Sequence, residues 1–184
     1  MGNTSFLTGI PSSGPQSVEE ALFQLENSST VFLASWQRVP KDLQRAGRVS
    51  IEAMTHLDHL VNEILRARDT LKAAGTYVSS TLKGQLDIDR GIMISPVTRA
   101  DQQALIAAGP GNGALPRTGV PIALEKLLNK IKHRHHASSN FRIDINYRHM
   151  FLINVDKPNQ QPDCIVEFDV ADFCNHCRVI APLI

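Results

Sequence analysis

Apolar residues recur at three- and four-residue steps over much of the first two thirds of the chain, which is the pattern of amphipathic helices. The longest stripe comprises Ile51, Met54, Leu57, Val61, Ile64, Leu65, Leu71, Val78 and Leu82. A helix of ~30 residues is ~45 Å long and exceeds the usual globular length. It is therefore expected to span the domain, to break near Gly75, or to offer its apolar face to a partner.

Signals for shorter helices flank this stripe. Ser17 and Glu20 have the spacing of a capping box, which predicts a first helix that ends near Asn27. A second apolar stretch over 30–38 favours a helix, and Pro40 interrupts it.

Further along the chain, Thr98 is expected to cap a helix that runs to Ala108. The segment 109–119 is rich in glycine and proline and predicts a loop. It contains no lysine, so it differs from a phosphate-binding loop. Pro121 suits the first position of the next helix, whose apolar face consists of Leu124, Leu127, Leu128 and Ile131.

The last part of the chain has β patterning. Apolar and polar residues alternate over 141–147, and denser apolar runs follow at 150–155 and 164–168. Short connections between these runs imply an antiparallel meander. Asp169 or Asp172 could cap a short final helix. The apolar cluster at 88–94 is too short to assign.

The pattern thus predicts an α+β fold, mainly a helical bundle with a C-terminal three-stranded antiparallel sheet and a short final helix. Residues 1–16 are expected to form a flexible N-terminal arm, and 17–184 a single domain with a helical part, 17–136, and a β-rich part, 140–184. A length of 184 residues and a hydrophobic content of 42% fit one core.

Composition narrows the class of protein. The formal net charge is +1, which gives no overall field that would attract nucleic acid or an anionic membrane. Three cysteines, all after residue 163, fit a reducing cytosol better than a disulfide framework. No apolar run reaches the ~18 residues of a membrane span. We therefore expect a soluble, cytoplasmic protein without membrane contact.

A basic cluster follows the apolar helix face at 124–131. It consists of Lys130, Lys132, His133, Arg134, His135 and His136. Cations at a helix C-terminus complement the helix dipole, so the cluster can be explained without any function in binding or catalysis. The functional alternative is contact with RNA phosphates, or acid–base catalysis by His133, His135 and His136.

The C-terminal cysteines are weak candidates for a metal site. Cys164, Cys174, His176 and Cys177 have the donor types of a zinc site, but a second closely spaced pair is missing. A redox Cys-x-x-Cys normally belongs to an alternating βαβ pattern, which this chain lacks. We expect buried, inert thiols, no metal and no other cofactor.

Long helices followed by a basic, histidine-bearing helix end loosely resemble the HEPN domains over residues 17–136. The signature of that family is an arginine, four to six residues, and a histidine on a helix. Here Arg142 and His149 have the spacing, in β-patterned sequence. The resemblance implies a helical bundle that often dimerises and sometimes cleaves RNA, with Arg142 and His149 as further candidate catalytic residues.

These observations favour a non-enzymatic interaction protein that self-associates through its long amphipathic helix or a sheet edge, as a homodimer or with a partner helix. The alternative is a metal-independent RNA-binding or RNA-cleaving HEPN-like protein that uses the basic cluster.

Overall fold

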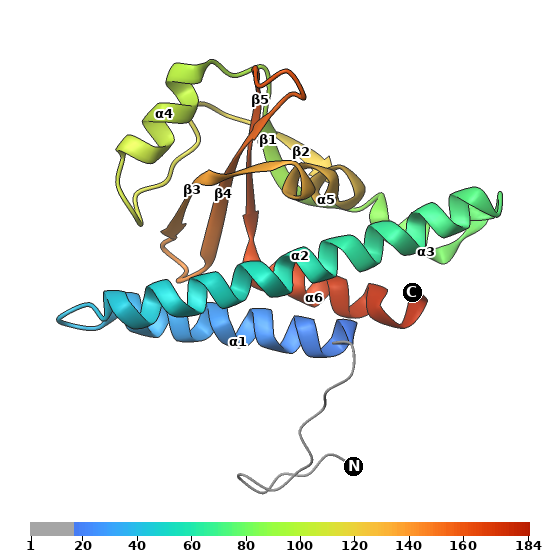
Figure 1. The fold of residues 1–184 in the computed structure, drawn as a ribbon, viewed down its shortest axis with the longest axis horizontal. Coiled ribbons are helices and arrows are strands. Elements are labelled where there is room, and N and C mark those ends of the chain that lie inside the picture. Colours follow the sequence, from blue (N-terminus) through green and yellow to red (C-terminus); the bar gives the residue numbers. More distant parts are fainter. Residues whose placement is uncertain (1–16) are drawn as a thin grey trace, which may run out of the picture.

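The structure, a computed structural model, describes residues 17–184, without the side chains of residues 135–137. The arm expected at 1–16 lies outside the described residues. Two antiparallel helices, α1 (Val18–Gln37) and α2 (Leu43–Ala73), form a hairpin across one end of the sheet (Figure 1). The helices α3 (Thr81–Leu86), α4 (Arg99–Ala107), α5 (Leu124–Lys132) and α6 (Val170–Ile180) follow. Short 3₁₀ turns η1 (Tyr77–Ser79) and η2 (Ala181–Leu183) flank α3 and α6.

Within the described residues the strands form one antiparallel sheet of five strands in the order β2-β1-β5-β4-β3. The strands are β1 (Asp89–Ile94), β2 (Val120–Ala123), β3 (Arg134–Ile143), β4 (His149–Asp156) and β5 (Pro162–Asp169). The α+β class and the β3-β4-β5 meander are confirmed. The expected three-stranded sheet is wrong in extent, because β1 and β2 from the supposedly helical part extend it.

The α1 helix differs from its prediction. Ser17 caps it, with its Oγ accepting the Glu20 amide at 3.1 Å, but the helix continues past Asn27 to Gln37. Residues 27–30 are polar but remain helical, and the Thr30 hydroxyl donates to the Glu26 carbonyl at 3.0 Å. The chain turns at Pro40, as expected.

The long stripe is largely core. Four of its members and the adjacent Leu60 are at most 3% exposed; the four are Leu57, Val61, Ile64 and Leu65. They pack with α1, α5, α6 and the inner face of the sheet. Ile51, by contrast, is 73% exposed, and Val78 lies in η1 beyond the helix. The helix ends at Ala73, before Gly75, whose φ is 71°, so a break near Gly75, one of the three alternatives, is the one observed.

The other face of the sheet carries α4. Thr98 caps this helix in a complete capping box with Asp101, as expected. Buried amides fasten α4 to the sheet: Asn140 Nδ2 donates to the Leu105 carbonyl at 2.7 Å, and Gln102 Nε2 to the Val155 carbonyl at 3.1 Å. Because buried amides must be bonded, these contacts fix the position of the helix.

Three local predictions need correction. Pro121 lies in the edge strand β2, where its missing N–H is tolerated, and α5 begins at Leu124. Tyr147 lies in a turn, since β3 ends at Ile143 and the Asp144 carboxylate accepts the Asn146 and Arg148 amides. The basic cluster lies only partly at a helix end, because α5 ends at Lys132 and β3 begins at Arg134.

Candidate functional site

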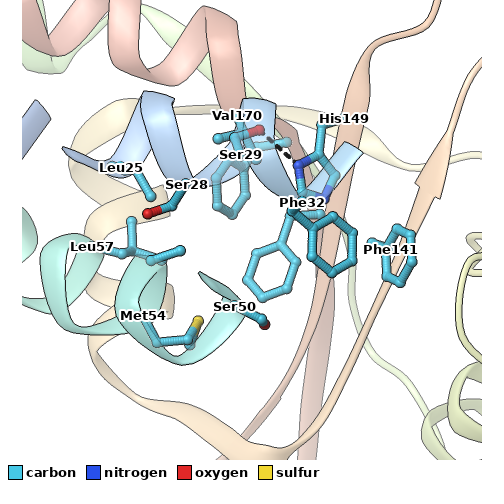
Figure 2. Close-up of a pocket in the computed structure, with 13 residues that line it drawn as sticks. Leu25, Ser28, Ser29, Phe32, Ser50, Met54, Leu57, Phe141, His149 and Val170 are labelled. Atoms are coloured by element: carbon cyan, nitrogen blue, oxygen red, sulfur yellow. Dashed lines mark hydrogen bonds between the residues drawn. The ribbon is translucent and has the colours of Figure 1, made fainter. Parts of the chain in front are cut away.

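The α1–α2 hairpin and the inner face of the sheet line a partly open apolar cavity of about 70 Å³ (Figure 2). Most of its walls are aliphatic or aromatic side chains, including Leu25, Phe32, Met54, Leu57, Phe141 and Val170. The polar lining residues are Ser28, Ser29, Ser50 and His149. Figure 2 shows the rings of Phe32, Phe141 and His149 on one side of this space and Leu57 and Met54 on the other. No charged residue lines the cavity among those described.

His149 and Ser29 form its polar edge. The His149 Nδ1 lies 2.8 Å from the Ser29 Oγ, so the first residue of β4 is tied to the middle of α1. The imidazole stacks on Phe32 at 5.2 Å between ring centres and meets Phe141 edge-on at 5.7 Å. Burial lowers the pKa of His149 to about 4. The imidazole is therefore neutral at pH 7 and can hydrogen-bond without adding charge.

Ser28 faces the same space with an uncommitted hydroxyl. The residue is 4% exposed and lines the cavity. In the same helix, Thr30 and Ser35 donate to carbonyls one turn earlier, at 3.0 and 2.8 Å. The Ser28 hydroxyl has no such partner within residues 17–184. The oxygen is not among the fully buried atoms that lack a partner, so it keeps accessible surface and can hydrogen-bond to a ligand in the cavity.

An aromatic cluster extends from the cavity to the surface. Trp36 stacks against Phe32 at 6.1 Å and meets Phe141 edge-on at 4.9 Å, while Lys41 Nζ lies 3.9 Å above the indole. A Cβ at Gly111 would approach Trp36 within 2.9 Å, so only glycine fits the loop there. Trp36 is the single tryptophan and one ring away from the cavity, which makes it a reporter of occupancy.

Part of the basic cluster lines a second concavity, here called the α5 groove, with a volume of about 880 Å³. Lys130, His133 and Arg134 contribute to it, as do Arg99 and Lys157, which the sequence analysis missed because they lie far away in the chain. Lys132 is exposed and does not line the groove. The side chains of His135 and His136 lie outside the described residues.

Carboxylates pair with most of these cations. Arg134, whose side chain is 2% exposed, donates to both Asp58 oxygens at 2.6 and 2.9 Å. Lys130 pairs with Asp163; burial disfavours its charge, but the bond to Asp163 prevails and raises the pKa of Lys130. Arg99 donates to Asp156 at 3.1 Å. The cluster is therefore an ion-paired wall rather than a free cationic helix end.

The resemblance-derived pair does not form one site. Arg142 lies opposite Met150 in the β3–β4 register, and His149 is the next residue along β4, so the two side chains project from opposite faces of the sheet. Arg142 Nε donates to the buried Glu167 at 2.9 Å on the face that bears α4. His149 does belong to the candidate site, but its partner is Ser29.

The three thiols are buried, and burial raises the pKa of Cys164 and Cys174 to about 12 and that of Cys177 further. His176 Nε2 lies 2.9 Å from the Gln85 carbonyl and Nδ1 3.1 Å from Arg90, so both ring nitrogens are engaged. No group of three or more His, Cys, Asp or Glu side chains within the described part of the chain is arranged to hold a metal ion.

Comparisons with protein-family models, with curated proteins and with solved structures give no match. None of the helices in residues 17–184 is long and apolar enough to cross a membrane. The cavity and the groove are therefore the features of the molecule that bear on its function.

Proposed function

We propose that the protein is a non-enzymatic binding protein and that the cavity between the α1–α2 hairpin and the sheet is its ligand site. The uncommitted hydroxyl of Ser28 inside apolar walls carries this proposal. Apolar pockets with a few convergent polar groups and a residue of perturbed pKa are the usual form of small-molecule sites.

The lining defines the class of ligand. A charged group would lose its hydration without gaining a counter-ion, since the described lining is uncharged. The ligand is therefore a small, uncharged, mainly apolar molecule with one hydrogen-bonding group for Ser28 or His149. A dry cavity of ~150 Å³ holds benzene, so in a cavity of about 70 Å³ a ring-sized ligand depends on movement of Met54, whose unbranched side chain adapts readily.

Cyclohexanol and cyclohexane are suitable probes, because neither absorbs where Trp36 is excited and they differ by one hydroxyl. We expect saturable changes in Trp36 emission and a raised Tm, with cyclohexanol the tighter ligand. Ser28→Leu should fill the cavity and abolish binding. Asn27→Leu, which introduces the same leucine one residue away on the exposed face of α1, should leave binding intact.

Two results would reject this function: no saturable response of the wild-type protein, or undiminished binding by Ser28→Leu. Ser28→Ala separates the two parts of the proposal, since it keeps the cavity and should remove only the advantage of cyclohexanol over cyclohexane.

Self-association through the edge of β3 is a second proposal. It is supported by the terminal place of β3 in the strand order, where the 109–113 loop meets Asn140, Phe141 and Arg142 at one end of the strand. The helix route has less support, because the α2 stripe packs inside the chain. Light scattering that gives a monomer mass at high protein concentration would exclude a stable dimer. An RNA-binding role has support only from three cluster residues that share the α5 groove.

A further inference from the structure

The α5 groove carries more positive than negative charge. Its basic lining residues come from the start of α4, the end of α5, the start of β3 and the β4–β5 turn; they are Arg99, Lys130, His133, Arg134 and Lys157. The acidic residues that line it are Asp156 and Asp163. It shares no lining residue with the apolar cavity, so it would serve a separate ligand.

The ion pairs leave two basic groups uncompensated. Asp156 and Asp163 each neutralise one cation, Arg99 and Lys130. Arg134 is neutralised by Asp58, which does not line the groove. The side chains of His133 and Lys157 are exposed and have no partner within the described residues. These two side chains are free to bind a ligand, whereas Arg99, Lys130 and Arg134 are already held in ion pairs.

A second observation concerns Arg134 itself. Its guanidinium is almost fully buried, yet its Nε–H is one of the few buried polar atoms with no hydrogen-bond partner in residues 17–184. Buried donors are normally satisfied, so this one leaves part of the guanidinium without a hydrogen-bonded acceptor. Because the atom is buried, an anion in the groove would interact with it through the electrostatic field and not through a direct hydrogen bond.

We propose that the α5 groove binds the phosphate group of a small ligand, contacted by Lys157 and His133 and backed by Lys130 and Arg134. Phosphate oxygens are strong acceptors for ammonium and guanidinium donors. Lys157 and His133 both line the groove, so both can donate to one bound phosphate group. An extended nucleic-acid backbone would instead place further phosphates near Asp156 and Asp163, which is unfavourable.

Inorganic pyrophosphate is the probe, titrated calorimetrically into the full chain at low ionic strength. We expect one site per chain, with binding weakened about tenfold by Lys157→Ala and again by His133→Ala, since each loses one charge-assisted bond. Both residues are exposed, so the variants should keep the wild-type Tm. Lys132→Ala is the matched control: it removes a neighbouring exposed cation that does not line the groove, and it should bind like the wild type.

A single-stranded RNA oligonucleotide distinguishes a phosphate ligand from a nucleic-acid backbone. For single strands the logarithm of the binding constant falls with that of salt by about 0.7 per phosphate contacted. A one-phosphate site predicts a slope of about that size and competition with pyrophosphate. The proposal is overturned if wild-type protein gives no saturable heat with pyrophosphate, if Lys132→Ala weakens binding as much as Lys157→Ala, or if RNA binds with a slope of several units that depends on Lys132.

Discussion

Two isoleucines of the long α2 stripe, Ile51 and Ile64, look alike in the sequence but occupy opposite environments in the fold. Ile64 is fully buried among α1, α5 and α6 residues, whereas Ile51 is 73% exposed. Replacing each by alanine removes the same three carbon atoms from the same helix. Because the residue type, the substitution and the helix are the same, a difference in stability between the two variants reports the burial of the side chain.

The expected magnitudes differ widely. Three buried carbons are worth about 2.4 kcal/mol at about 0.8 kcal/mol each, and the cavity left behind raises the loss for Ile64→Ala to about 3–4 kcal/mol. For a chain of this size that corresponds to a fall in Tm of about 10 °C. Ile51→Ala loses little burial and gains helix propensity, so its free energy of unfolding should stay within about 0.5 kcal/mol of the wild type.

Urea denaturation followed by far-UV circular dichroism measures both variants, with unchanged slopes as the sign that the unfolding transition is comparable. Leu57→Ala should also lose about 2–5 kcal/mol and, because Leu57 lines the cavity, it should enlarge the ligand site. Equal losses for the two isoleucine variants, or none for Ile64→Ala, would refute the assignment of the stripe to the core.

Three further predictions test other parts of the fold. The pKa of His149 is about 4 in the folded protein against 6.5 when unperturbed, so between these pH values the unfolded state binds a proton that the folded state does not. The free energy of unfolding should therefore fall as the pH drops from 6.5 to 4. His149→Phe should flatten that dependence in denaturation experiments at pH 4–7. Cys174→Ser and Cys177→Ser should each cost about 1–3 kcal/mol through a buried hydroxyl, and a chelator should leave the Tm of the wild type unchanged; loss of the fold on chelation would restore the zinc hypothesis. Tyr147 is 76% exposed with a φ of 59°, so Tyr147→Gly should raise the free energy of unfolding by up to about 1 kcal/mol, and a lower value would show that the ring has an unrecognised contact.

Patterns that act over one or two helical turns were sufficient where local chemistry decides the structure. The cap at Thr98 and the apolar face of α5 follow from such patterns. Asp169 as the cap of α6 and Gly75 as the end of α2 were each one of the alternatives that these patterns left open. The meander formed by β3, β4 and β5 also follows, because adjacent strands with short connections pair with each other.

The strands β1 and β2 were not predictable in the same way. β1 lies between β2 and β5, and its Met93 and Ile94 contribute to different cores on the two faces of the sheet, so its apolar residues show no period of two. β2 contains Pro121, which resembles a helix start in sequence and is tolerated only because β2 is an edge strand. Both assignments depend on the position of a strand in the sheet, and a short stretch of sequence does not reveal that position.

The candidate site shows the same limit at the level of single side chains. Asn27, Ser28, Ser29 and Thr30 form a polar run that indicates the end of a helix, because serine and asparagine compete with helical hydrogen bonds. The run remains helical because Ser29 meets His149, 120 residues later in the chain, and Thr30 bonds within its own helix. Asn27 is exposed to water, whereas Ser28 is a buried residue whose hydroxyl has no partner within the described fold. A polar run that stays helical beside an apolar cavity thus locates the residue that a ligand would satisfy, and this places the binding proposal on Ser28 rather than on the more conspicuous histidines.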